Sequence, residues 1–123
     1  MVYDKNRCHY NVAKYLKQHP EDTCVVAYSN VAKLENGKST WLFRDDDLRV
    51  SREVLMLWYA RTGIPGHVHL RRGDLIGDIL SDTMVFKTKR EWILENGLLF
   101  QDCKNTVACA YVREVVKQLL LKT

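Results

Sequence analysis

The chain has no lysine between Ser39 and Phe86, although lysine and arginine together number 19 in the whole sequence. Six of its nine arginines fall inside this stretch, between Arg44 and Arg72. Net charge alone does not require this segregation, because the two residue types carry the same charge. A guanidinium, unlike an ammonium, binds phosphate or carboxylate through two parallel hydrogen bonds and stacks on aromatic faces. The stretch is therefore the first place to expect a binding site.

Long apolar runs are also missing, and none approaches the roughly 20 residues that a membrane-spanning helix needs. The first residues, Met1–Asp4, do not have the basic and then apolar pattern of a secretory signal. We therefore expect a protein of the cytoplasm or the nucleus, with no membrane contact. The length of 123 residues, with 46% hydrophobic and 28% charged residues, predicts one globular domain over residues 1–123.

Metal and cofactor signatures are lacking as well. The four cysteines (Cys8, Cys24, Cys103 and Cys109) do not show the Cys-x2-Cys spacing of zinc sites. In a reducing compartment we expect them to be free thiols that pack as small hydrophobic residues. The sequence also has no Gly-rich phosphate-binding loop. It thus predicts no cofactor.

Asn36-Gly37 is the clearest local signal among the residues that are present. It separates two strand-like runs, and both residues tolerate the positive φ that a type I′ turn requires. We expect a β-hairpin over about 23–44. Its register places Glu35 opposite Lys38 and Ala32 opposite Trp41.

The remaining segments alternate between helix and strand patterns. The expected order is a helix ending at Gln18, the hairpin, a helix from Asp47 or Ser51 to Gly63, a strand over 67–70, a turn over 71–74, a short helix over 75–80, a strand over 83–88, a helix capped by Thr88 and ended by Gly97, a short strand over 98–100, and a last helix from Asn105 or Thr106. This mixture predicts an α+β fold, a small and mainly antiparallel sheet covered by helices.

Within the arginine-rich stretch, Arg71 and Arg72 are the sharpest candidates for anion binding. Arg44, Arg49 and Arg52 can instead pair with the run Asp45–Asp47. His67 and His69 precede Arg71 at alternating positions of a strand, so both imidazoles should point to one face. Together with the amides around Gly73, these four side chains could converge on a phosphate.

Three more cations extend this candidate site. Lys87, Lys89 and Arg90 lie where a strand ends and a helix begins, a place where exposed amides favour anions. Phe86 and Trp92 could offer stacking surfaces for bases, although an amphipathic helix would bury Trp92.

Two catalytic interpretations stay open beside anion binding. His67-x-His69 could bind a metal or divide acid and base roles on a phosphodiester, and the alternative is a pair of hydrogen-bonded strand histidines. Asp45–Asp47 could hold Mg²⁺ with Asp74, Asp78 or Asp82, and the alternative is turn and helix-capping material.

We therefore expect a small, non-catalytic binding or regulatory protein that engages an acidic partner. RNA or DNA comes first and an acidic protein surface second, since a net charge of +4 and a pI of about 8.9 favour such encounters. The alternative is a protein–protein interaction module, acting as a homodimer, inhibitor or adaptor through the hairpin edge or Leu119–Leu121. A third possibility is a small nuclease that uses His67 and His69 or Asp45–Asp47.

Overall fold

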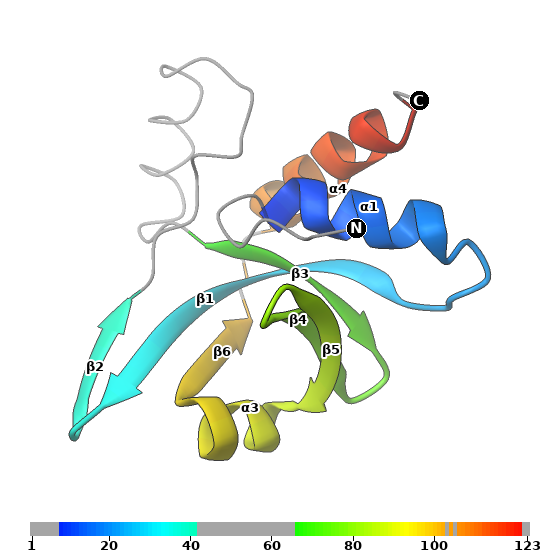
Figure 1. Cartoon of the computed structure of the whole chain (residues 1–123). Helices are drawn as coiled ribbons and strands as arrows, with labels where there is room; N and C mark the ends of the chain where they lie inside the picture. The colour runs from blue at the N-terminus through cyan, green and yellow to red at the C-terminus, as the bar shows by residue number, and fades with distance from the viewer. Residues whose placement is uncertain (1–7, 42–65, 103, 105, 122–123) are drawn as a thin grey trace.

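Three helices and six strands make up the part of the chain that the computed structural model describes, namely residues 8–41, 66–102, 104 and 106–121 (Figure 1). In chain order they are α1 (Cys8–Gln18), β1 (Val25–Glu35), β2 (Lys38–Trp41), β3 (His67–Arg72), β4 (Leu75–Leu80), β5 (Thr83–Thr88), α3 (Lys89–Asn96), β6 (Leu98–Asp102) and α4 (Thr106–Leu121). The helix predicted up to Gly63 and the run Asp45–Asp47 lie outside the described residues.

The predicted hairpin is confirmed. β1 and β2 pair in antiparallel fashion, with Glu35 opposite Lys38 and Ala32 opposite Trp41. Asn36 and Gly37 both have positive φ, at 52° and 76°, as a type I′ turn requires.

All pairings in the sheet are antiparallel among the described residues. β3 pairs with β1, β4 with β3, and β5 with β4. β6 also pairs with β1, over Ser29–Lys33, which follows the segment of β1 that pairs with β3. β5 and β6 do not pair with each other within these residues, so the sheet is not closed. The chain is thus a single compact α+β domain, as its sequence predicts.

Two local predictions in this sheet are wrong. Arg71 and Arg72 belong to β3, and the turn that follows contains only Gly73 and Asp74. Residues 75–80 form β4 and not a helix, because β4 is hydrogen-bonded to β5 along its whole length and to β3 at its start. Gly77 fits this central strand since it lies opposite Phe86, whose ring occupies the space where a Cβ would project.

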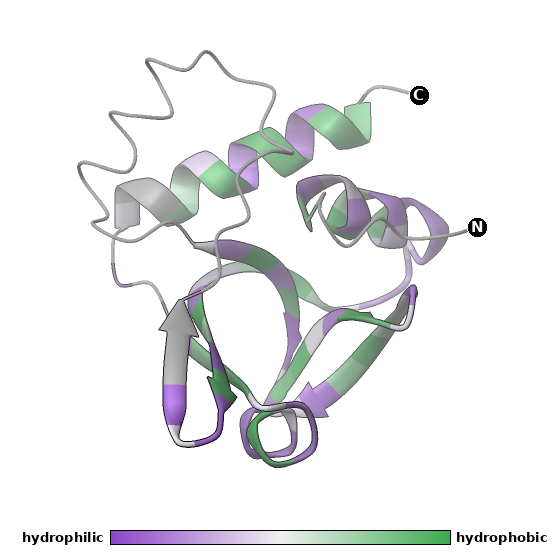
Figure 2. Cartoon of the chain, turned by 60° about the vertical axis from the view of Figure 1, so that its left-hand side comes forward, coloured by the Kyte–Doolittle hydropathy of each residue, from purple (hydrophilic) through white to green (hydrophobic). Residues whose placement is uncertain are grey.

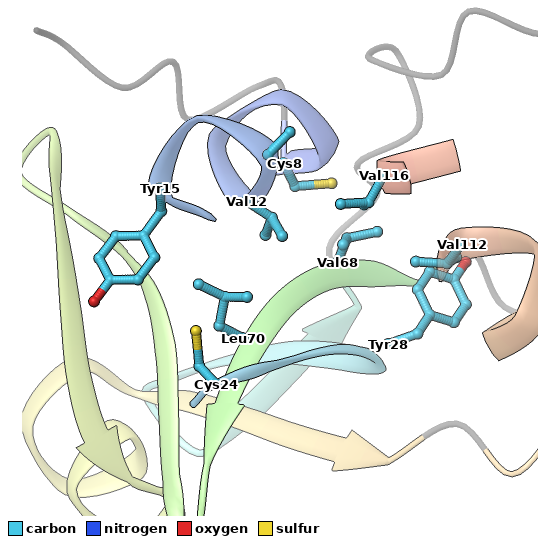
Figure 3. Close-up of a cluster of buried hydrophobic side chains, with 10 residues drawn as sticks. Cys8, Val12, Tyr15, Cys24, Tyr28, Val68, Leu70, Val112 and Val116 are labelled. Carbon is cyan, nitrogen blue, oxygen red and sulfur yellow. The ribbon is translucent and has the colours of Figure 1, made fainter. Parts of the chain in front are cut away.

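The outer face of the sheet, as we call the side covered by α1 and α4, carries the larger core. Figure 1 shows the two helices side by side over β1 and β3, with α3 at the opposite end of the sheet. Figure 2 shows hydrophobic and hydrophilic segments alternating along α4, as in an amphipathic helix. In Figure 3, Val12 of α1 and Val116 of α4 point toward Val68 and Leu70 of β3. These four side chains are at most 2% exposed.

The inner face, on the opposite side, carries a second core made by Val31, Ile76, Trp92 and Phe100. It lies on the opposite side from Leu70 because Ile76 is the cross-strand partner of Arg71, the next residue along β3. Trp92 is fully buried, as predicted, and its Nε1–H donates to the carbonyl of Ile76 at 2.9 Å. This bond fastens α3 to β4.

The cysteines within the described residues are free thiols. Cys8 and Cys24 are buried in the outer core, and Cys109 packs against it in a half-buried position. The prediction that these residues pack as small hydrophobic side chains is confirmed for all three.

Candidate functional site

The strand β3 distributes the predicted anion-binding residues over both faces of the sheet. His67, His69 and Arg71 lie on the inner face, because side chains alternate along a strand. Arg72 lies on the outer face with Val68 and Leu70. The two imidazoles do share one face, as predicted, and their ring centroids are 6.3 Å apart. The structure does not bring Arg72 to the same site.

His67 forms a buried pair with Asp78 of β4. Its Nε2 lies 2.8 Å from Asp78 Oδ2, and the two side chains are 3% and 11% exposed. Burial would raise the pKa of Asp78, but the charge and hydrogen bond of His67 outweigh it and hold that pKa below its usual range. The Asp78 carboxylate is therefore ionised and accepts from His67 Nε2–H. Nδ1 of His67 is buried and has no hydrogen-bond partner among the described residues.

His69 is held on two sides. Its Nδ1 lies 3.1 Å from the carbonyl oxygen of Leu70, and its Nε2 lies 2.8 Å from the hydroxyl of Ser29 on β1. Burial, together with the neighbouring His67, lowers the pKa of His69 to about 4. The imidazole is therefore neutral at pH 7. Because the Leu70 carbonyl can only accept, the proton of this neutral ring is on Nδ1.

Arg71 follows His67 and His69 on the inner face of β3 and lies at the rim of the sheet. Its guanidinium donates to Asp102 Oδ1 of β6 at 2.9 Å, and the same carboxylate oxygen lies 3.4 Å from the Ser29 hydroxyl. Six polar side chains therefore follow one another on the inner face. We call them the inner polar row: Ser29, His67, His69, Arg71, Asp78 and Asp102.

The residue types of the inner polar row could support general acid–base chemistry, but their exposure argues against it. Ser29 and His69 are fully buried, and His67 is 2% exposed. A substrate would have to separate the strands to reach them. The described residues also contain no group of three or more histidine, cysteine, aspartate or glutamate side chains placed to hold a metal ion. The row is best explained as a hydrogen-bonded core network.

Arg72 is committed to a second network on the outer face. Its Nη2 and Nε donate to the two carboxylate oxygens of Asp22 at 2.9 and 3.2 Å, and its guanidinium carbon lies 3.8 Å above the ring of Phe86. The hydrogen bond from Tyr15 is the largest cause that lowers the pKa of Asp22 to about 2. Burial, and then this bond, raises the pKa of Tyr15 to about 12. Arg72 therefore ties β3 to α1 and β5 and is not available as a free cation.

Lys87 is also paired. Its ammonium donates to Glu95 Oε1 at 3.0 Å and to Asn96 Oδ1 at 2.8 Å, and it lies 5.3 Å from the centre of the Trp92 ring. Its side chain is only 14% exposed. Phe86 and Trp92 are packed too, one under Arg72 and the other in the inner core. The two aromatic residues considered for base stacking thus face other parts of the domain.

Lys89 and Arg90 differ from the other predicted site residues. Both are exposed in the first turn of α3, and the side chain of neither makes a hydrogen bond or an ion pair with any residue that the structure describes. Glu91, the next residue along the chain, points back to the helix start, where its Oε1 accepts from the Thr88 amide at 3.0 Å. Thr88 Oγ1 in turn accepts from the Glu91 amide at 3.1 Å, which completes the predicted capping box.

This geometry changes how an anion could bind at α3. The capping box already occupies the amides of Thr88 and Glu91, so they do not form the amide site that the sequence suggests. The cations themselves remain exposed. We call Lys89 and Arg90 the α3 cationic pair, and they are the predicted site residues that stay open to a partner.

Sequence reasoning did not predict several of the partners that decide these roles. Ser29, Asp22 and Asp102 carry no motif, and each is distant in sequence from the residue it binds. Asp78 stood out only as a possible magnesium ligand, within a segment predicted to be helical. Residues 76–80 do not alternate between polar and apolar, so no local pattern could have placed Asp78 beside His67, and only the pairing of β4 with β3 does so.

No protein-family model matches the sequence, and no curated protein or solved structure is significantly similar to it. None of the described helices is long and apolar enough to cross a membrane.

Proposed function

We propose that this protein is a small, non-catalytic binding protein that engages an acidic partner, with RNA or DNA as the first candidate, through the α3 cationic pair. The observation that carries the proposal is that Lys89 and Arg90 are adjacent and exposed while the carboxylate of the next residue, Glu91, is held in the capping box. Two exposed cations that form no ion pair among the described residues can attract phosphates, and the net charge of +4 helps the encounter.

The fates of the other predicted site residues support binding rather than catalysis. His67 and His69 are enclosed in the inner polar row, while Arg71, Arg72 and Lys87 are each paired with a carboxylate. These five side chains shape and stabilise the domain that presents the α3 cationic pair. A partner that bound these charges directly would compete with the internal carboxylates that already bind them.

A salt titration with matched variants tests this proposal. The probe is a fluorescein-labelled single strand of about 20 nucleotides, as RNA or as DNA, long enough for several phosphate contacts. We expect binding to weaken steeply between about 50 and 200 mM salt. The double variant Lys89→Glu with Arg90→Glu should weaken binding about tenfold or more at the lower salt concentration.

The control variant carries Lys104→Glu and Lys117→Glu, two exposed lysines outside α3, and changes the net charge by the same amount. It should bind nearly as well as the unmodified protein. Equal losses in both double variants would show that only overall charge matters. A response that does not depend on salt would contradict the electrostatic proposal altogether.

A protein–protein interaction module is the second candidate, and the open edge of β5 favours it. Among the described residues β5 pairs only with β4, so its other edge offers backbone groups to a further strand. Leu119 and Leu120 are weaker support for a dimer, because both pack against the outer core and only Leu121 is largely exposed. Sedimentation over a dilution series tests this candidate, and a monomer at every concentration would exclude the homodimer.

A further inference from the structure

The hydroxyl of Ser29 lies between two acceptors that compete for its one proton. His69 Nε2 is 2.8 Å away, and Asp102 Oδ1 is 3.4 Å away. A serine hydroxyl donates one hydrogen bond and can accept others. The hydroxyl can therefore donate to only one of the two neighbours at a time.

The state of His69 decides which neighbour receives the proton. In the neutral ring Nδ1–H donates to the Leu70 carbonyl, so Nε2 is an acceptor and Ser29 must donate to it. When His69 takes up a proton, Nε2 also becomes a donor. Ser29 then has to accept from Nε2–H, and its own proton is free to turn toward Asp102 Oδ1.

We propose that His69, Ser29 and Asp102 form a proton-linked switch, in which protonation of the buried histidine reverses the Ser29 hydrogen bond and draws the Asp102 carboxylate toward the Ser29 hydroxyl. Asp102 is the last residue of β6 and the cross-strand partner of Ser29. It also accepts from Arg71 at 2.9 Å, so the switch acts on an ion pair at the rim of the sheet. A change in the core thus reaches the surface through one hydroxyl group.

The charged groups around His69 set the pH range of the switch. His67 and Arg71 on β3 disfavour the imidazolium, whereas Asp78 on β4 favours it. β6 contributes Asp102 through the Ser29 hydroxyl, while β1 contributes the uncharged Ser29 itself. Burial is the largest influence and lowers the pKa of His69 to about 4. The switch is accordingly set for acidic conditions rather than for pH 7.

Nuclear magnetic resonance on the full chain tests the proposal, with imidazole ¹⁵N shifts reporting His69 and the carboxyl ¹³C shift reporting Asp102. At pH 7 we expect His69 to carry its proton on Nδ1. On acidification the Asp102 signal should contain a step with the same midpoint as His69. A proton on Nε2 at pH 7, or no shared step, would overturn the proposal.

Ser29→Ala removes the hydroxyl and leaves every charge in place. We expect His69 to titrate still in this variant. The step in the Asp102 ¹³C signal that has the same midpoint as His69 should largely disappear. A step of unchanged size would mean that the coupling passes through space and not through Ser29.

Asp102→Ala provides an independent test, because Asp102 is exposed and its replacement leaves the core intact. Asp74→Ala is its charge-matched control, in the exposed turn between β3 and β4. We expect the pH midpoint of the His69 titration to fall in Asp102→Ala and to remain unchanged in Asp74→Ala. The same midpoint in both variants would overturn the switch.

Discussion

Gly77 lies directly opposite Phe86 in the β4–β5 ladder, and a Cβ on Gly77 would come within 2.4 Å of the Phe86 ring. The ring cannot easily move away, since Arg72 covers one side of it and Tyr15 meets it edge to face at 5.6 Å. The absence of a side chain at position 77 therefore lets β5, β3 and α1 meet on the outer face.

We predict that Gly77→Ala destabilises the fold by about 2 kcal/mol through overpacking. Urea unfolding measures the change. Adding Phe86→Leu should make the combined loss smaller than the sum of the single losses, because the two side chains compete for one space. Additive losses would show that the contact with the ring is not the cause.

Replacing Arg72 by lysine should cost about 1 kcal/mol, since an ammonium cannot reproduce the two parallel hydrogen bonds to Asp22. Asp22→Asn in the same protein should reduce the effect of Arg72→Lys, and a double-mutant cycle by urea unfolding measures the coupling. Nucleic-acid affinity should not change in Arg72→Lys. A loss of affinity without a loss of stability would show that Arg72 does contact the nucleic acid.

Acid should destabilise the protein through His69. The pKa of this histidine is about 4 in the fold and 6.5 in its ordinary state, so the unfolded chain binds more protons between these values. Stability is then greatest above pH 6.5 and falls as the pH drops toward 4, by about 3 kcal/mol in all.

Unfolding curves at a series of pH values test the acid effect. His69→Gln should lower stability at pH 7, because the core loses its fitted imidazole, but should flatten the slope between pH 6.5 and 4. An equally steep slope in this variant would assign the pH dependence to other groups.

The capping box of α3 gives a further prediction. Thr88→Ala removes the side chain that accepts from the Glu91 amide and should cost about 1 kcal/mol. Thr83→Ala at the exposed start of the same strand is the matched control and should have a smaller effect. Thermal unfolding compares the two variants. Equal shifts would mean that the capping bond contributes little.

Turn and capping residues were sufficient to predict two of the elements correctly. The hairpin follows from Asn36-Gly37, which tolerate the positive φ that the turn requires, and its register was correct to the residue. The same holds for α3, which Thr88 and Gly97 delimit by capping. Such signals depend on neighbours within one turn, so the rest of the fold hardly alters them.

Residues 75–80 show the opposite case. A short apolar run with a central glycine is compatible with a helix or a strand, and only pairing with β3 and β5 decided between them. That decision also placed Asp78 beside His67. The change from a turn to a strand at Arg71 and Arg72 then separated the two arginines onto opposite faces.

The sequence by itself determined the α+β class, the hairpin, the capped helix α3 and the concentration of arginine in one stretch. The tertiary structure decided which charges remain open to a partner. Ion pairs such as Arg72 with Asp22 join residues far apart in sequence, and burial of His67 and His69 depends on the strands and helices packed around them. Exposure and pairing are properties of the assembled fold, and they moved the candidate site from the arginines of β3 to Lys89 and Arg90.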